Sequence, residues 1–214
     1  MRTDIDLYYP TRSTFDPTLP YYGNPMPDWY YGGTETVGAI PNIFVVDWVL
    51  VELRDAVSPG AAIPSTAIAT IPAFVLNTGD VVALDGLSPL LVSAGYTNNL
   101  YAVIWNRNHL GVISANPLVE SGGVFTYDFS SGSGQAYGAG SQKNLGGGVY
   151  GMISGDGNGD GFIGSDDETA VWTSWAGMYW GYSPADYNYD EQINNIDKND
   201  FWFPNRGAGS QIPE

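Results

Sequence analysis

The sequence predicts a mainly β protein: an antiparallel β-sandwich, preceded by an extended arm and followed by a small unit built on a repeated loop. Short runs of β-branched and aromatic residues recur between turn residues from position 41 onward. A pattern rich in Asp, Asn and Gly occurs twice between residues 155 and 197. We therefore expect an arm over residues 1–37, a sandwich domain over 38–148 and the repeat unit over 149–214.

The arm contains pairs of tyrosines and five prolines, too many for a helix, so we expect it to be extended. Within it, Ile5, Leu7 and Tyr9 alternate with other residues, which predicts one short half-buried strand. An arm of this kind has no core of its own, so its aromatic side chains need cover from this chain or from a neighbouring molecule. The alternative is a disordered tail, although disordered segments usually contain few aromatic residues.

The body begins with a long apolar run over 43–54, which predicts a central strand. The next run, over 67–76, is expected near a sheet edge because Pro72 has no backbone N–H. Residues 77–80 form a predicted turn, so 67–76 and 81–84 make a hairpin. Residues 130–148 are rich in glycine and serine and predict a flexible loop. Further strands are expected, with the regular spacing of a sandwich, over 90–92, 100–106, 110–115 and 123–129.

The repeat near the C-terminus places equivalent residues thirty positions apart. In the pattern of a twelve-residue calcium loop, side-chain oxygens fall at positions 1, 3, 5 and 12, and a main-chain carbonyl is expected at position 7. The predicted ligands are Asp156, Asn158, Asp160, Phe162 and Asp167 in the first copy, and Asp186, Asn188, Asp190, Gln192 and Asp197 in the second.

These oxygen ligands suit a hard cation, and Ca²⁺ takes about six to eight oxygens at about 2.3–2.6 Å. A single match of this kind is often only a solvated turn. Two matches in phase, each followed by an amphipathic stretch (169–175 and 198–203), favour two Ca²⁺ sites. We expect the second site to be weaker, because Glu191 stands where the first copy has Gly161 and the turn there needs a positive φ. Ile163 and Ile193 are expected to be buried and to pair through a short β-contact.

The charge of the chain is strongly negative, with 7 Lys and Arg against 23 Asp and Glu, a net −16. Such a field repels nucleic acid and anionic lipid surfaces and attracts divalent cations. We therefore expect no nucleic-acid partner, and folding of the repeat unit that depends on calcium. No run approaches the roughly 18 apolar residues of a membrane span. The high Tyr, Trp and Gly content is typical of an extracellular β-rich protein.

Two resemblances follow from these motifs. The paired loops with Asp at position 12 look like a dockerin repeat. Four further segments of the wider chain carry a second resemblance: DWVLVELR (47–54), NRNHLGV (106–112), GGGVYGM (146–152) and SQIP (210–213). Through them the chain over residues 38–214 resembles the C-terminal region of large uncharacterised secreted surface proteins of Bacteroidetes-type bacteria. That resemblance implies a bacterial protein that is extracellular or on the cell surface and has no established catalytic activity.

No catalytic motif stands out, so we expect that the chain is not an enzyme. The one histidine, His109, lacks a recognisable nucleophile motif, and a structural role at a strand end is favoured. An acid pair for glycoside hydrolysis depends on distances that a sequence does not reveal, although most acids cluster in the loops. The first hypothesis is a calcium-stabilised subunit of an extracellular filament, a head-to-tail homo-oligomer assembled by strand addition of the arm. The alternative is an adhesion or carbohydrate-binding module with a dockerin-like docking unit.

Overall fold

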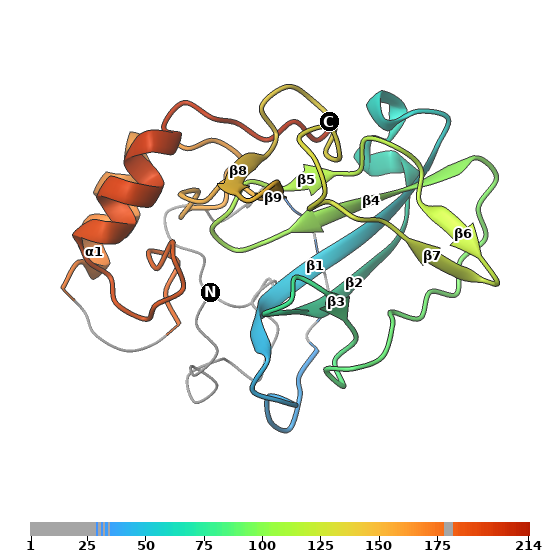
Figure 1. Cartoon of the computed structure of the whole chain (residues 1–214), viewed down its shortest axis with the longest axis horizontal. Coiled ribbons are helices and arrows are strands. Elements are labelled where there is room, and N and C mark those ends of the chain that lie inside the picture. The colour runs from blue at the N-terminus through green and yellow to red at the C-terminus, as the bar shows by residue number, and fades with distance from the viewer. Residues whose placement is uncertain (1–28, 30, 32, 34, 178–181) are drawn as a thin grey trace.

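The computed structural model describes residues 29, 31, 33, 35–177 and 182–214, and this part of the chain is mainly β (Figure 1). The expected β-rich class is confirmed. The strands are β1 (Val45–Ala56), β2 (Ala67–Leu76), β3 (Val81–Val82), β4 (Asn99–Trp105), β5 (Val112–Ile113), β6 (Val119–Ser121), β7 (Val124–Thr126), β8 (Lys143–Gly146) and β9 (Val149–Gly151).

One curled antiparallel sheet dominates, with strand order β3-β2-β1-β4-β5. Two hairpins, β6–β7 and β8–β9, stand beside it. The described residues thus form one large sheet with two small hairpins, and not the two facing sheets of the expected sandwich. The short strands after β4 are the reason, because runs of two to four residues cannot build a second sheet of similar size.

The expected central strand is confirmed as β1, which pairs with β2 on one side and β4 on the other. Its side chains alternate between two buried faces, with Trp48 and Leu50 on the larger core and Val49 and Val51 on the smaller one. Burial on both faces explains why the run is almost continuously apolar. The expected strand over 67–76 is confirmed as β2, whose outer side is paired with β3 only at Phe74 and Val75.

Two expectations for the later strands are wrong. Residues 90–92 form no strand, and Leu91 is 92 % exposed. Residues 130–148 are more than a flexible loop, because β8 begins within them and Ala136 is buried. The amide of Tyr137 donates to the carbonyl of Ile113 at 2.9 Å, so this segment continues the sheet beyond β5. Backbone hydrogen bonds, which composition does not show, hold it there.

The larger core is covered by chain ends. Trp29 is buried and lies against Trp105, with ring centroids 6.4 Å apart, so this part of the expected arm packs on the chain's own body. At the other terminus, Ile212 contacts the same core, and the buried guanidinium of Arg54 donates to the carbonyl of Pro213 at 2.9 Å. The expected strand at Ile5, Leu7 and Tyr9 lies outside the described residues.

The helical segments are short. Two follow β1: η1 (Pro59–Ala61) and η2 (Pro64–Thr66). The expected amphipathic stretches after the repeated loops are confirmed as helical, with η3 (Asp167–Trp172) and α1 (Thr173–Trp175) after the first, and η4 (Asp197–Trp202) and η5 (Phe203–Asn205) after the second. In the part of the chain that is described, no helix has the length and apolarity needed to cross a membrane.

Candidate metal centre

The two copies of the repeat are loop 1 (residues 156–167) and loop 2 (residues 186–197). They form the same backbone hydrogen bonds to the side chains at positions 1, 3 and 5, and differ in one of the two amides that the position-12 carboxylate accepts. At position 1, the carboxylate of Asp156 accepts the amides of Asp160 and Gly161, each at 3.1 Å. The equivalent bonds to Asp186 measure 3.1 and 3.0 Å. A carboxylate that accepts amides from later in its own loop curls the backbone around itself, as a cation-binding loop requires.

Positions 3 and 5 repeat the pattern over shorter spans. Asn158 Oδ1 accepts the amide of Asp160 at 3.1 Å, and Asp160 Oδ1 accepts the amide of Phe162 at 3.0 Å. The corresponding distances in loop 2 are both 2.9 Å. These are Asx-type turns, which Asp and Asn form readily because a short side chain reaches the backbone two residues on.

Position 12 closes each loop. The carboxylate of Asp167 accepts the amide of Asn158 at 3.2 Å and that of Gly164 at 2.7 Å. In loop 2, Asp197 accepts the amides of Tyr187 and Asn194, both at 2.9 Å. Each position-12 residue is also the first residue of the helical segment that follows. Both ends of each loop are therefore tied to one carboxylate.

These carboxylates are deeply buried, since Asp167 and Asp197 are 0 % exposed and Asp156 and Asp186 are 3 % exposed. Burial is the largest cause that raises the pKa of Asp167 and of Asp197 to about 7. Burial, together with the charges of Asp167 and Asp160, raises the pKa of Asp156 well above its ordinary value. Buried carboxylates in this state are stabilised by a proton or by a cation.

A preformed cage is absent from the described residues, where no three His, Cys, Asp or Glu side chains converge as metal ligands do. The donor set nonetheless fits a calcium ion in its chemistry: each loop offers three carboxylates and an amide oxygen, with a main-chain carbonyl at Phe162 or Gln192. Zn²⁺ fits less well, because these loops contain neither His nor Cys.

The backbones of the two loops differ in strain. In loop 1 the residues with positive φ are Gly159 (72°) and Gly161 (79°). In loop 2 the same positions are Tyr189 (59°) and Glu191 (65°). The positive φ expected at Glu191 is confirmed, and Tyr189 is a second strained residue that sequence reasoning missed. Each L-residue held in this region costs about 1–2 kcal/mol, so other contacts must stabilise loop 2.

Those contacts come from the four residues after β4, a polar turn over 106–109. The hydroxyl of Tyr189 donates to Asn106 Oδ1 at 2.8 Å, and its ring stacks on His109 with centroids 5.1 Å apart. Burial, reinforced by the charge of Arg107, lowers the pKa of His109 to about 3. His109 is therefore neutral in the folded protein, and it has the structural contacts expected of it.

Arg107 places a positive charge near Asp186 of loop 2. Among the interactions described, no such charge acts on Asp156 or Asp167 of loop 1. The buried guanidinium of Arg107 donates to Asp47 at 3.1 Å and to the carbonyl of Ser183, and lies over the ring of Tyr182 at 4.0 Å. Its charge partly offsets the burial that raises the pKa of Asp186. Sequence reasoning missed this residue, although a polar Asn-Arg-Asn-His run directly after an apolar strand is a visible signal.

The loops contact each other, but not in the expected way. Ile163 and Ile193 are both buried, as expected, yet they belong to different apolar clusters and form no β-contact with each other. The amide of Ile163 instead donates to the carbonyl of Ala208 at 2.9 Å, and the carbonyl of Ile193 accepts the amide of Gly177 at 2.9 Å. Each loop therefore pairs with the segment that follows the other loop's helix. This pairing satisfies backbone groups of Ile163 and Ile193 that the expected β-contact would have used.

The two loops also pack against each other at position 2. A Cβ on Gly157 would lie 2.6 Å from the hydroxyl oxygen of Tyr187 and 2.9 Å from Val171 Cγ1. That hydroxyl donates to the carbonyl of Asp167 at 3.2 Å. The missing side chain in loop 1 thus makes room for the tyrosine of loop 2, which explains why the two copies differ at this position.

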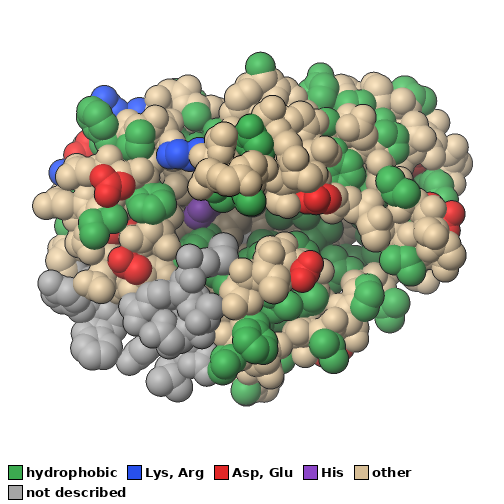
Figure 2. All heavy atoms as spheres, in the orientation of Figure 1, with side chains coloured by type: hydrophobic (Ala, Val, Ile, Leu, Met, Phe, Trp, Pro, Cys, Tyr) green, Lys and Arg blue, Asp and Glu red, His purple; other side chains and the backbone are tan. Residues whose placement is uncertain are grey.

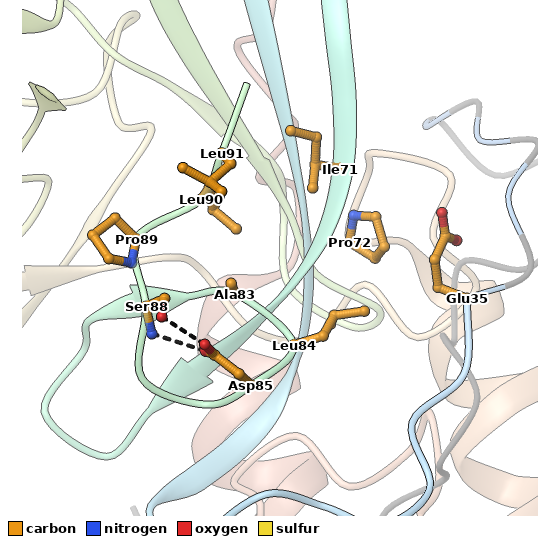
Figure 3. Close-up of a pocket in the computed structure, with 10 residues that line it drawn as sticks. All are labelled: Glu35, Ile71, Pro72, Ala83, Leu84, Asp85, Ser88, Pro89, Leu90 and Leu91. Atoms are coloured by element: carbon orange, nitrogen blue, oxygen red, sulfur yellow. Dashed lines mark hydrogen bonds between the residues drawn. The ribbon is translucent and has the colours of Figure 1, made fainter. Parts of the chain in front are cut away.

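A second candidate site lies on the sheet, away from the loops. A groove of about 350 Å³ runs beside β2 (Figure 3), and the turn that forms part of its lining is held by hydrogen bonds from Ser88 to Asp85 and from the amide of Ala83 to the carbonyl of Ser88. Its wall is largely apolar, and the residues that line it are Glu35, Ile71, Pro72, Ala83, Leu84, Asp85, Ser88, Pro89, Leu90 and Leu91.

On the face that Figure 2 draws, the acidic side chains of the described residues do not gather in a single patch. Figure 2 shows acidic side chains at both ends of the visible face, with fewer basic ones. Comparison of the chain with known protein families, with curated proteins and with solved structures found no match.

Proposed function

We propose that this protein is a non-catalytic structural subunit of an extracellular bacterial filament or surface assembly, stabilised by two calcium ions in dockerin-like loops. The observation that carries the calcium proposal is the burial of four carboxylates, Asp156, Asp167, Asp186 and Asp197, at the first and last positions of two loops with matching hydrogen bonds.

The physical argument is one of compensation. A buried carboxylate is costly to ionise unless a cation lies close to it. Each loop carries three carboxylates, so one Ca²⁺ leaves a charge near −1, and without it the carboxylates repel one another. The backbone already curls around the position-1 carboxylate, so the loop loses less conformational entropy when the ion binds. Calcium therefore stabilises the folded state over the unfolded chain, where no such loop exists.

Calorimetric titration of metal-stripped protein with CaCl₂ tests this proposal, with MgCl₂ as the comparison ion. We expect two binding events, the weaker one in loop 2, and a higher melting temperature in calcium. At a free concentration of about 100 times Kd, each site adds about 2.7 kcal/mol of stability. An unchanged melting temperature at millimolar calcium, with no heat of binding, would refute it.

The assembly proposal concerns residues 1–37 and the sheet edge. An extended segment gains most by adding to an open edge, where main-chain hydrogen bonds provide affinity and pockets accept alternate side chains. β2 has ten residues, of which β3 pairs with two, and Ile71 and Pro72 of the remainder line the apolar groove. We propose that Ile5, Leu7 and Tyr9 of a neighbouring molecule bind there, because a head-to-tail contact that does not close into a ring generates a filament.

Truncation tests this part, and the structure decides where to cut. Trp29, Tyr31 and Val37 pack on the larger core, so removal of residues 1–37 would damage the body itself. Removal of residues 1–28 is the cleaner variant. We expect it to remain folded and to bind calcium but to sediment as a monomer, while the full chain forms fibres in calcium. Fibres of the truncated protein, or a full chain that stays monomeric at high concentration, would contradict the proposal.

The second candidate is an adhesion or carbohydrate-binding module whose dockerin-like unit binds a partner. Exposed apolar side chains on that unit favour it, namely Phe162 (51 %), Ile196 (47 %) and Phe203 (55 %). Electron microscopy with calcium separates the two functions, since fibres favour the subunit and uniform single particles favour the module.

A further inference from the structure

Asn108 contacts the beginning of both calcium loops. Its main-chain carbonyl accepts the amides of Gly155 at 3.0 Å and Asp156 at 3.2 Å, where loop 1 begins. Its side-chain amide donates to the carbonyl of Asp186 at 2.8 Å, where loop 2 begins. Asn108 is 0 % exposed and lies three residues after the end of β4, so it ties both loops to one end of the sheet.

The two ties differ in kind. At loop 1, backbone amides donate to the main-chain carbonyl of Asn108, a group that any residue at this position has. Loop 2 binds the side chain, which also donates to the carbonyl of Pro184 at 3.2 Å and accepts the hydroxyl of Tyr189 at 3.2 Å. Substitution at Asn108 therefore removes the tie to loop 2 and leaves the tie to loop 1.

Loop 2 also needs outside support more than loop 1 does. It holds Tyr189 and Glu191 at positive φ, where loop 1 has glycines. The polar turn over 106–109 supplies that support through Asn106, Arg107 and His109, which contact Tyr189 or lie near Asp186. Hydrogen bonds to Asp186 and Asp197 also hold loop 2 from within, and the turn adds the contacts that reach the strained residue Tyr189 itself.

We infer that the second calcium site is completed by the sheet: Asn108 positions Asp186, and loop 2 is a calcium site only while the turn after β4 holds it. This inference rests on the proposed calcium function and adds its regulation to it. Loop 1 is joined to the turn through a main-chain carbonyl and has glycines at its positive-φ positions, whereas loop 2 depends on side chains of the turn and therefore responds to the state of the sheet. A partner strand that orders the sheet would therefore change calcium affinity in loop 2 and not in loop 1.

A direct route between the loops also exists, because Tyr187 donates to the carbonyl of Asp167 and Trp172 Nε1 donates to that of Asn194 at 3.0 Å. The experiment must separate this route from the one through Asn108. Tyr187→Phe removes the direct hydrogen bond and leaves Asn108 intact. Asn42→Ala is the matched control for Asn108, because Asn42 also donates across the fold, to the carbonyl of Gly86 at 3.0 Å, far from the loops.

Calcium titration of the full chain, followed by amide hydrogen exchange resolved by loop, tests the inference. In Asn108→Ala we expect the affinity of loop 2 to fall by about fivefold or more, the lower end of typical coupling between sites. Loop 1 should keep its affinity within about twofold, and Asn42→Ala should leave both loops unchanged. Equal losses in both loops, or no loss in loop 2, would overturn it.

Two further measurements keep the test decisive. If Asn108→Ala does not fold, Tyr189→Phe removes one support of loop 2, and an unchanged loop-2 affinity in that variant would count against the inference. If the unmutated protein binds no calcium, the proposed function fails. The hydrogen bond from Asn108 to Asp186 is then tested by amide hydrogen exchange in metal-free protein. Asn108→Ala should speed exchange at the amides of Glu191 and Asn194 but not at those of Gly161 and Gly164.

Discussion

The hydroxyl of Tyr189 donates a hydrogen bond to Oδ1 of Asn106 at 2.8 Å, although 83 residues separate them in the chain. Tyr189 has a φ of 59°, an unfavourable backbone for a tyrosine, at the loop position where the first copy of the repeat has a glycine. The contact with the end of β4 therefore stabilises a backbone conformation that loop 2 would not adopt alone.

The carboxylate at position 12 should decide calcium affinity in loop 1. Asp167→Asn keeps the shape of the side chain but removes its charge, so we expect Kd for loop 1 to rise at least about tenfold, or about 1.4 kcal/mol. Asp166→Asn is the matched control, because Asp166 is exposed, lies outside the predicted ligand set and accepts a hydrogen bond from Asn158 at 2.8 Å. Titration calorimetry measures both, and equal effects would contradict the ligand assignment.

Stability should depend on pH in opposite ways with and without calcium. Burial raises the pKa of Asp167 and of Asp197 to about 7 in the folded, metal-free chain. An acid whose folded pKa exceeds its unfolded value binds protons preferentially when folded. Its contribution is therefore complete below about pH 4 and is lost as the pH rises through about 7. Bound calcium replaces those protons, so calcium affinity should increase over the same range.

Urea unfolding from pH 5 to 8, with metal-stripped and calcium-saturated protein, measures this difference. His109, with its pKa lowered to about 3, has the opposite sign: it destabilises the fold as the pH falls below its ordinary value near 6.5. That effect is common to both forms, so the gap between the two curves isolates the carboxylates. Parallel curves would argue against calcium at these residues.

Gly157→Ala should destabilise the C-terminal unit by about 1–3 kcal/mol, the usual range for overpacking. The added methyl would lie 2.6 Å from the Tyr187 hydroxyl. Gly134→Ala is the control, since a Cβ there meets no atom within 4 Å. Tyr187→Phe in the Gly157→Ala background should recover part of the loss. Thermal unfolding is the measurement, and equal melting temperatures for the two alanine variants would show that the contact is not tight.

Glu191→Gly should stabilise the protein by about 1 kcal/mol and tighten calcium binding in loop 2, because glycine adopts a positive φ without the steric cost. Gly161→Ala is the reciprocal change in loop 1, at a φ of 79°, and should have the opposite sign. Chemical unfolding of both variants measures the pair. A destabilising Glu191→Gly would mean that contacts of the Glu191 side chain outweigh the backbone strain.

Local patterns were sufficient for the elements whose signals lie close together in the chain. The apolar run that forms β1 and the Pro-containing run that forms β2 were predicted nearly to their observed ends, because burial on both faces leaves a continuous pattern. The curl of the two loops also follows from local sequence, since the bonds of Asp156 to Asp160 and Gly161 lie within one turn of chain, while the metal ligands themselves stay a prediction. Short-range hydrogen bonds follow from short-range sequence.

Long-range features were decided by the tertiary structure. No local pattern reports that Arg107 lies beside Asp47 and near Asp186, or that Ile163 pairs with Ala208 rather than with its repeat partner. Such pairings depend on which surfaces meet after the chain has folded, and several partners satisfy the same backbone groups equally well. The sequence by itself determined where the two Asp- and Asn-rich loops and the long strands β1, β2 and β4 occur. Only the tertiary structure decided that side chains after β4 support loop 2, because strain at Tyr189 is offset by residues that are distant in the chain.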